Sequence, residues 1–328
     1  MKNEIRLAEF EQAIRKGNRV VLAQAITLVE SQRPDDVALA NQLVEKLLPY
    51  SGKSVRLGIT GVPGVGKSTF IESLGKRLTA QGKKLAVLAI DPTSYKTKGS
   101  ILGDKTRMEE LSRDPNAFIR PTATGTALGG VADRTREAIL VCEAAGFDVI
   151  IIETVGVGQS EVAVRNLVDF FLLLMLAGAG DELQGIKKGI MEMADAFVIT
   201  KADGHNIQRA QQAQADYQHA LHLLAESPSG WVPQVLTASA IEHTGIQETW
   251  NLVEKYVNHT KDNGFFEQNR IEQKRVWFRE GIQQRIHQRL QQDQAVQDKI
   301  REYEQKILMN QILPARAAEE IIRVFFEG

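Results

Sequence analysis

Short apolar runs alternate with helical stretches through the middle of the chain. Near-continuous hydrophobicity over five to eight residues is typical of strands that are buried on both faces. Six runs have this character: residues 55–59, 84–90, 148–153, 170–177, 196–200 and 234–239. Stretches with helical spacing between them, such as 69–82 and 135–146, complete βαβ units. The pattern predicts an α/β fold whose mostly parallel, doubly wound sheet is covered by helices on both sides.

Helical periodicity replaces this alternation at both ends of the chain. The first part places apolar side chains at the spacing of two or three amphipathic helices. Beyond about residue 265 the helical period returns, with Phe278, Ile282 and Ile286 four residues apart. An extended helical arm of this kind favours pairing with a second copy of the chain, a homodimer, over packing on its own domain. We therefore predict three parts: an N-terminal helical segment over 1–50, an α/β domain over 51–262 and a C-terminal helical dimerisation arm over 263–328.

The composition narrows the possible partners and compartment. Of the 328 residues, 40 are Lys or Arg and 41 are Asp or Glu, so the net charge of −1 argues against a nucleic-acid partner. The N-terminus has no apolar signal region, and the run at 170–177 is too short to span a bilayer. Cys142 is the only cysteine, so we expect a buried structural thiol and no disulfide within the chain. These features predict a cytoplasmic protein without a membrane partner.

The first predicted strand runs into a phosphate-binding motif, G-x-x-x-x-G-K-[ST], and a helical stretch follows the motif. The glycines allow backbone N–H groups to curl around an anion, and the helix N-terminus adds its positive end. Lys67 would contact the terminal phosphates, and the Ser68 hydroxyl would enter a Mg²⁺ shell. The motif predicts that the domain over 51–262 binds a nucleotide through nine residues: Gly61, Val62, Pro63, Gly64, Val65, Gly66, Lys67, Ser68 and Thr69.

Three acidic residues are candidates for holding the metal and orienting water. Asp91 and Glu153 stand at the ends of predicted strands, and Asp104 lies in a loop. Ligands of an open α/β sheet bind at the carboxyl ends of the strands, so Asp91 and Glu153 are correctly placed. Asp104 taken alone could equally be a solvated loop acid.

A further strand end carries the string TKAD at 200–203, which fits the GTPase motif [NT]-K-x-D. Asp203 would accept two hydrogen bonds from the guanine edge, and the methylene stem of Lys201 would cover the ring. Adenine lacks this pair of donors, so a buried Asp203 would reject ATP. The sequence therefore predicts GTP and GDP as ligands. Three residues at the end of the next strand are expected beside the base: Ala238, Ser239 and Ala240.

Several longer strings together resemble one family. GVPGVGKST, DPTS, GSILGDKTRM, ETVGVGQSE, GDELQGIKKGIMEMAD and TKAD resemble the MeaB/ArgK family, which are G-protein chaperones of adenosylcobalamin-dependent methylmalonyl-CoA mutase. The likeness runs from about residue 15 through the C-terminal arm. It implies a homodimer linked by C-terminal helices that binds the mutase or a relative. It also implies that GTP is coupled to loading intact cofactor and clearing damaged cofactor.

The resemblance also implies roles for individual residues. The stretch 178–188 corresponds to a mobile loop that senses the partner, with Asp181 among its polar members. The implied Mg²⁺ shell is Ser68, Asp91, Asp104 and Glu153. The implied catalytic residues are Lys67, Glu153, Gln184 and Lys187.

Two residues depart from the wider GTPase pattern. Thr200 replaces the usual Asn of N-K-x-D, and we expect it to lose a hydrogen bond that ties the base loop to its surroundings. Glu153 stands where many GTPases have Asp, and no Gln follows the glycine after it to position water. Intrinsic hydrolysis should therefore be slow, with the partner completing the site.

Two other functions stay open at this point. A nickel-type metallochaperone GTPase would need clusters of Cys and His, but His219 and His222 form the only close pair, and a solvated helix face explains them as well. A GTP-dependent kinase would need a second constellation that phosphorylates a substrate, and the sequence shows none.

Overall fold

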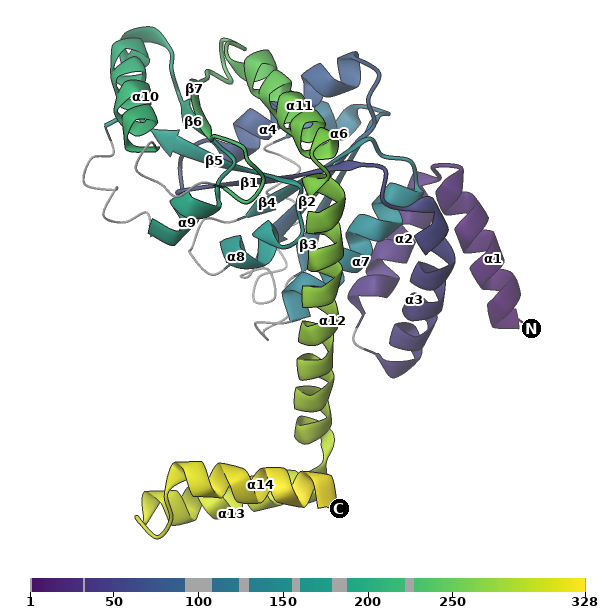
Figure 1. Cartoon of the computed structure of the whole chain (residues 1–328). Helices are drawn as coiled ribbons and strands as arrows, with labels where there is room; N and C mark the ends of the chain where they lie inside the picture. The colour runs from purple at the N-terminus through teal and green to yellow at the C-terminus, as the bar shows by residue number, and fades with distance from the viewer. Residues whose placement is uncertain are drawn as a thin grey trace. The chain divides into compact units, whose positions relative to one another are not determined.

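The structure is a computed structural model (Figure 1), and it describes residues 2–31, 33–91, 108–123, 130–154, 160–178, 188–221 and 227–327. The chain divides into two compact units, Met1–Gln273 and Lys274–Gly328. The division predicted from the sequence, at residues 50 and 262, stays a prediction.

The first unit is built on one parallel sheet. In the described residues the strand order is β3-β2-β4-β1-β5-β6-β7, and every neighbouring pair is parallel. This order confirms the predicted doubly wound sheet and places β1 at its centre, where ligand sites of such sheets occur. The strands are β1 (Val55–Gly61), β2 (Leu85–Asp91), β3 (Ala117–Ala123), β4 (Val149–Thr154), β5 (Phe170–Leu176), β6 (Ala196–Thr200) and β7 (Gln234–Thr237).

Strand β3 was not predicted from the sequence. Its string, AFIRPTA, contains Pro121, which cannot donate to a ladder of hydrogen bonds, and the charged Arg120. The strand lies at the edge of the sheet and pairs only with β2, so one missing donor is tolerated there. Arg120 reaches Glu30 with its guanidinium 2.5 Å from the carboxylate, which explains a charge within a strand.

The N-terminal residues form three helices, where two or three were predicted, and these pack within the first unit. Asn18 caps α2, because its side chain accepts hydrogen bonds from the backbone of Val20 and Val21. Pro34 opens α3 at a position where its missing N–H costs nothing. Helices α2 and α3 both contact α7. The helices of this part are α1 (Lys2–Arg15), α2 (Arg19–Glu30), α3 (Pro34–Leu47) and α7 (Gly130–Ala144).

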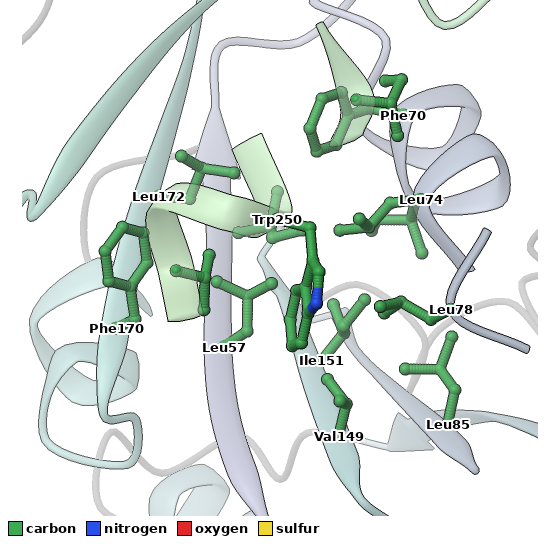
Figure 2. Packing of buried hydrophobic residues seen from close by; sticks show 14 of the residues in the cluster. Leu57, Phe70, Leu74, Leu78, Leu85, Val149, Ile151, Phe170, Leu172 and Trp250 are labelled. Atoms are coloured by element: carbon green, nitrogen blue, oxygen red, sulfur yellow. The ribbon is translucent and has the colours of Figure 1, made fainter. Parts of the chain in front are cut away.

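Further helices cover the sheet. The cluster in Figure 2 joins alternate strand residues such as Leu57 and Ile151 to Leu74 of α4 and Trp250 of α11. Helix α7 contacts β2 and β4, and its buried residues stand outside this cluster, which indicates the opposite face. The covering elements are α4 (Lys67–Ala80), α6 (Glu109–Arg113), α8 (Ser160–Arg165), α9 (Lys188–Met193), α10 (Ile207–Leu221) and α11 (Ile246–Asp262), with short 3-10 turns at Leu48–Tyr50 and Gly204–Asn206.

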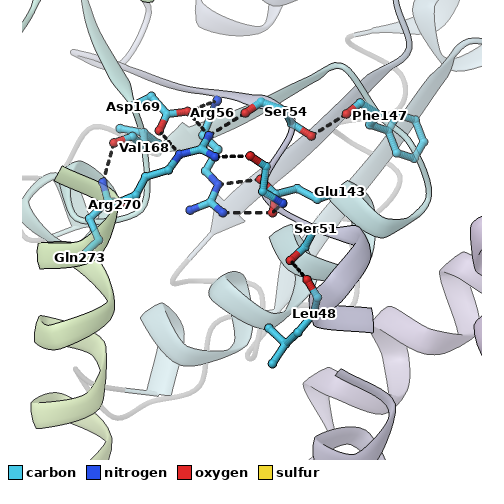
Figure 3. A network of polar contacts seen from close by, with 11 residues as sticks. Leu48, Ser51, Ser54, Arg56, Glu143, Phe147, Val168, Asp169, Arg270 and Gln273 are labelled. Carbon is cyan, nitrogen blue, oxygen red and sulfur yellow. Dashed lines mark hydrogen bonds and ion pairs between the residues drawn. The ribbon is translucent and has the colours of Figure 1, made fainter. Parts of the chain in front are cut away.

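A buried polar network lies at the amino ends of β1 and β5 (Figure 3). Arg56 of β1 forms two hydrogen bonds with Glu143 of α7, at 2.9 and 3.0 Å. Asp169, just before β5, accepts from the backbone N–H of Arg56 at 2.8 Å. Arg270 of α12 (Phe265–Gln292) donates two hydrogen bonds to the same carboxylate, from Nε at 2.8 Å and from Nη2 at 2.7 Å. The network therefore ties the start of α12 to the sheet.

The second unit is helical, as expected for the C-terminal arm. After the end of α12 it contains α13 (Gln294–Leu308) and α14 (Pro314–Glu327), which pack together. Phe278 and Phe326 are largely exposed. Across the described part of the chain, no helix combines the length and apolar character needed to cross a membrane. Cys142 is buried in the first unit, as predicted, and burial raises the pKa of its thiol.

Candidate functional site

The phosphate loop joins the end of β1 to the start of α4. Gly64 and Gly66 adopt φ angles of 81° and 93°, a region that favours glycine, and Gly66 directly precedes the helix. A Cβ at Gly61 would lie 2.5 Å from the carbonyl oxygen of Leu174 on β5, so a larger residue would push the two strands apart. The glycines are therefore required by the path of the loop. The backbone N–H groups at the start of α4 are available to an anion.

Lys67 folds back over the loop that precedes it. Its Nζ donates to the carbonyl oxygens of Gly61 and Val62 at 2.7 and 3.2 Å. Burial lowers the pKa of this ammonium, while the charges of Glu153 and Glu161 oppose the shift. An ammonium held by weak neutral acceptors in a partly buried position is well suited to exchange them for phosphate oxygens.

Glu161 was not singled out from the sequence. It lies in α8 and is almost fully buried, and its charge acts on Lys67. Its place in the string ETVGVGQSE was the available signal, but nothing in the spacing indicates that the side chain turns toward the phosphate loop.

Two of the four predicted metal ligands lie together. Glu153 is at the carboxyl end of β4, opposite Ile59 of β1, and its Oε1 accepts from the Ser68 hydroxyl at 3.2 Å. The backbone of Asp91 ends β2 at the same edge, one residue beyond the pair of Ile90 with Thr154. The side chain of Asp91 and all of Asp104 lie outside the described residues.

The donor atoms of Ser68 and Glu153 are hard oxygens, which fit Mg²⁺. Within the described ranges, no three Cys, His, Asp or Glu side chains gather into a metal site. A complete Mg²⁺ shell therefore needs oxygens from Asp91, Asp104, the nucleotide or water. His219 lies in α10, whereas His222 falls outside the described part of the chain.

The predicted base-binding residues meet at the ends of β6 and β7. The Ser239 hydroxyl donates to Oδ2 of Asp203 at 2.5 Å, and Ser239 is fully buried. The N–H of Ala202 donates to the carbonyl oxygen of Ala238 at 3.1 Å, which links the two strand ends. Lys201 has a φ angle of 57°, and its carbonyl oxygen accepts from the Asn206 amide at 2.7 Å. Asp203 is thus held with one carboxylate oxygen fixed by Ser239.

The expectation for Thr200 was wrong. Its hydroxyl lies 2.7 Å from the carbonyl oxygen of Val65 and 3.1 Å from that of Met175, in reach of both. The threonine hydroxyl therefore supplies a hydrogen bond to the surroundings, which the replacement of asparagine was expected to remove. It joins the phosphate loop to the end of β6, where the base-binding string begins.

The predicted partner-sensing loop begins at this edge of the sheet. Strand β5 ends at Leu176, and Leu174 pairs with Gly61 of β1, so the chain enters the stretch beside the phosphate loop. Asp181, Gln184 and Lys187 lie outside the described residues. Their predicted roles stay predictions.

Comparison with known proteins identifies close relatives of the chain. The family model for the methylmalonyl Co-A mutase-associated GTPase MeaB matches residues 22–295. GTPase ArgK of Escherichia coli is 49% identical over 286 residues, which cover 87% of this chain and 86% of that protein. The mitochondrial methylmalonic aciduria type A homolog of Mus musculus is 46% identical over 320 residues, covering 94% and 77%. A crystal structure of an LAO/AO transport system kinase has a TM-score of 0.79, 39% identity and 99% coverage of both chains.

Proposed function

Because the chain belongs to the family of methylmalonyl-CoA mutase-associated GTPases, as its motifs predicted, we propose that it is a GTP-driven chaperone of an adenosylcobalamin-dependent acyl-CoA mutase. It is a GTPase, in keeping with its relatives. The family match over residues 22–295 supports the link to a mutase. The hydrogen bond of the Thr200 hydroxyl to Val65, which joins the phosphate loop to the strand before Asp203, supports the nucleotide site. In this proposal GTP is coupled to loading intact cofactor on the mutase and clearing damaged cofactor.

The phosphate end of the site binds and orients the nucleotide. Lys67 exchanges the carbonyls of Gly61 and Val62 for oxygens of the β- and γ-phosphates, and the N–H groups of the loop surround the β-phosphate. Ser68 and Glu153, with Asp91 and Asp104, would hold Mg²⁺, which neutralises charge on these oxygens when bound. These side chains would therefore act by positioning the nucleotide and by stabilising its negative charge.

Guanine is read by Asp203, and Asp203→Asn should change base choice from guanine to xanthine. The Ser239 hydroxyl donates to Oδ2, so it would hold the amide oxygen and turn the NH₂ group toward the base. Xanthine offers a carbonyl where guanine has an amino group, and the amide NH₂ complements it. Titration calorimetry should show at least about a tenfold loss for GDP and a gain for XDP. Wild-type affinity for GDP with no gain for XDP would show that Asp203 does not read the base.

The partner is expected to complete the catalytic site through residues 178–188. This stretch contains Asp181, Gln184 and Lys187 among three glycines, a composition that can move and then become ordered. The entry from β5 beside Gly61 supports the idea that an ordered loop would reach the nucleotide. One charge brought to the transition state can supply a few kcal/mol, which corresponds to an acceleration on the order of a hundredfold.

Replacing Gln184 and Lys187 by alanine should remove this acceleration and spare basal turnover. The measurement is GTP hydrolysis with and without a cobalamin-dependent mutase, alongside binding of the mutase by both proteins. Equal acceleration of the wild type and the double variant would exclude the loop as the sensor.

The C-terminal arm and the location complete the proposal. The arm over 263–328 pairs two copies of the chain, because the exposed Phe278, Ile282 and Ile286 form an apolar row along α12. The homodimer acts in the cytoplasm, where the mutase partner would also be found.

A further inference from the structure

The loop after β7 carries a contact that the GTPase motifs do not account for. Ser239 and Thr244 exchange two backbone hydrogen bonds, at 3.0 and 3.1 Å, which close the loop between them. The Ser239 hydroxyl accepts from the backbone N–H of Glu242 at 3.1 Å and donates to Asp203 at 2.5 Å. The position of residues 242 and 243 therefore bears on the hydroxyl that orients Asp203.

His243 fixes this loop to the helix that begins at the phosphate loop. Its Nδ1 lies 2.8 Å from the hydroxyl of Ser73, a buried residue of α4. His243 has a φ angle of 56°, a conformation that residues other than glycine rarely adopt and that needs support from the surroundings. The hydrogen bond to Ser73 is such a support.

One side of α4 contacts both this loop and the start of α11. Ser73 and Arg77 of α4 and Gln81, which caps the C-terminus of the helix, are spaced four residues apart, so they lie on one side of it. The Arg77 Nε and the Gln81 amide both donate to Oε1 of Gln247 in the first turn of α11, at 2.5 and 2.9 Å. Of these three residues, Ser73 is nearest the phosphate loop along the chain. Its partner, His243, lies within the loop that Ser239 and Thr244 close, whereas Gln247 lies outside it.

We propose that His243 is a positioning residue for guanine recognition. Through Ser73 it fixes the base loop to the helix that carries Lys67 and Ser68, and through Ser239 it keeps Asp203 aimed at the 2-amino group of guanine. This inference rests on the proposed role of Asp203 as the base reader. It predicts that loss of the contact lowers discrimination for guanine more than it lowers nucleotide affinity as a whole.

The test compares the affinities for GDP and IDP, which differ only in the 2-amino group. Ser73→Ala and His243→Gly remove the contact from its two sides, and glycine also removes the strain at this φ. Each should lower the ratio of the IDP and GDP dissociation constants about three- to tenfold. The double variant should lower it no further, because both changes break one contact. His243→Asn should keep the ratio within about twofold of the wild type, because its amide can replace Nδ1 and it tolerates positive φ.

Gln247→Ala is the matched control, since it breaks the two neighbouring contacts of α4 outside the closed loop. Its ratio should stay within about twofold of the wild type. A ratio that stays at the wild-type value in both Ser73→Ala and His243→Gly, whether both affinities fall equally or neither changes, would overturn the proposal. A wild-type ratio near one would instead show that Asp203 does not read the 2-amino group, which removes the premise.

Discussion

Replacing Lys67 by alanine is expected to weaken binding of GTP and GDP at least about a hundredfold while the protein stays folded. The loop motif supplies no other cation, and the two hydrogen bonds of Nζ to Gly61 and Val62 are those that phosphate oxygens would take over. A hydrogen bond to a charged group contributes about 1.5–3 kcal/mol, and a hundredfold loss corresponds to about 2.7 kcal/mol. Titration calorimetry measures the change directly.

Lys46→Ala is the control for loss of a positive charge, because Lys46 is exposed on α3. It should bind GDP as the wild type does, and both variants should show cooperative thermal unfolding. Affinity of the Lys67 variant within about threefold of the wild type would refute the assignment of the phosphate loop.

The largest effect on stability is expected from Asp169→Ala. Asp169 is 2% exposed and accepts from the Arg56 N–H and from two nitrogens of Arg270. Its loss would leave the guanidinium of Arg270 and a backbone donor without their buried partner. Removing one member of a buried ion pair costs about 3–5 kcal/mol. Urea unfolding followed by tryptophan fluorescence, to which Trp231 and Trp250 of the first unit and Trp277 of the second contribute, gives the free energy of unfolding.

Glu302→Ala serves as the comparison for this network. Glu302 pairs with Lys299 and Lys306 on the exposed side of α13, and solvent screens both pairs. Its unfolding curve should match that of the wild type. A loss below about 1 kcal/mol for Asp169→Ala would mean that the network in Figure 3 does not hold the start of α12 to the sheet.

The sequence predicted those parts of the fold in which one local pattern is sufficient. Strands β1, β4 and β5 are near-continuous apolar runs because both of their faces are buried, and the phosphate loop has a fixed spacing of glycines and Lys67. Strand β3 was missed because Pro121 and Arg120 are tolerated only at a sheet edge. The residues of a strand do not by themselves show which position the strand takes in the sheet.

The contacts within the site were harder to predict because they join distant residues. The Thr200 hydroxyl meets Val65, which is 135 residues away along the chain, and His243 meets Ser73 at a separation of 170. The GTPase motif predicted that Asp203 lies near Ser239, since both follow neighbouring strands. The motif could not predict that the hydroxyl of Thr200 would make a hydrogen bond in place of the asparagine that usually stands there.

The most direct measurement is nucleotide turnover by the wild-type protein with and without an adenosylcobalamin-dependent acyl-CoA mutase from the same organism. GTP and ATP are compared in parallel, because Asp203 should exclude ATP. We predict slow hydrolysis of GTP alone, an acceleration on the order of a hundredfold by the mutase, and no turnover of ATP in either case. Turnover of GTP that no such mutase changes would contradict the proposed coupling to cofactor loading.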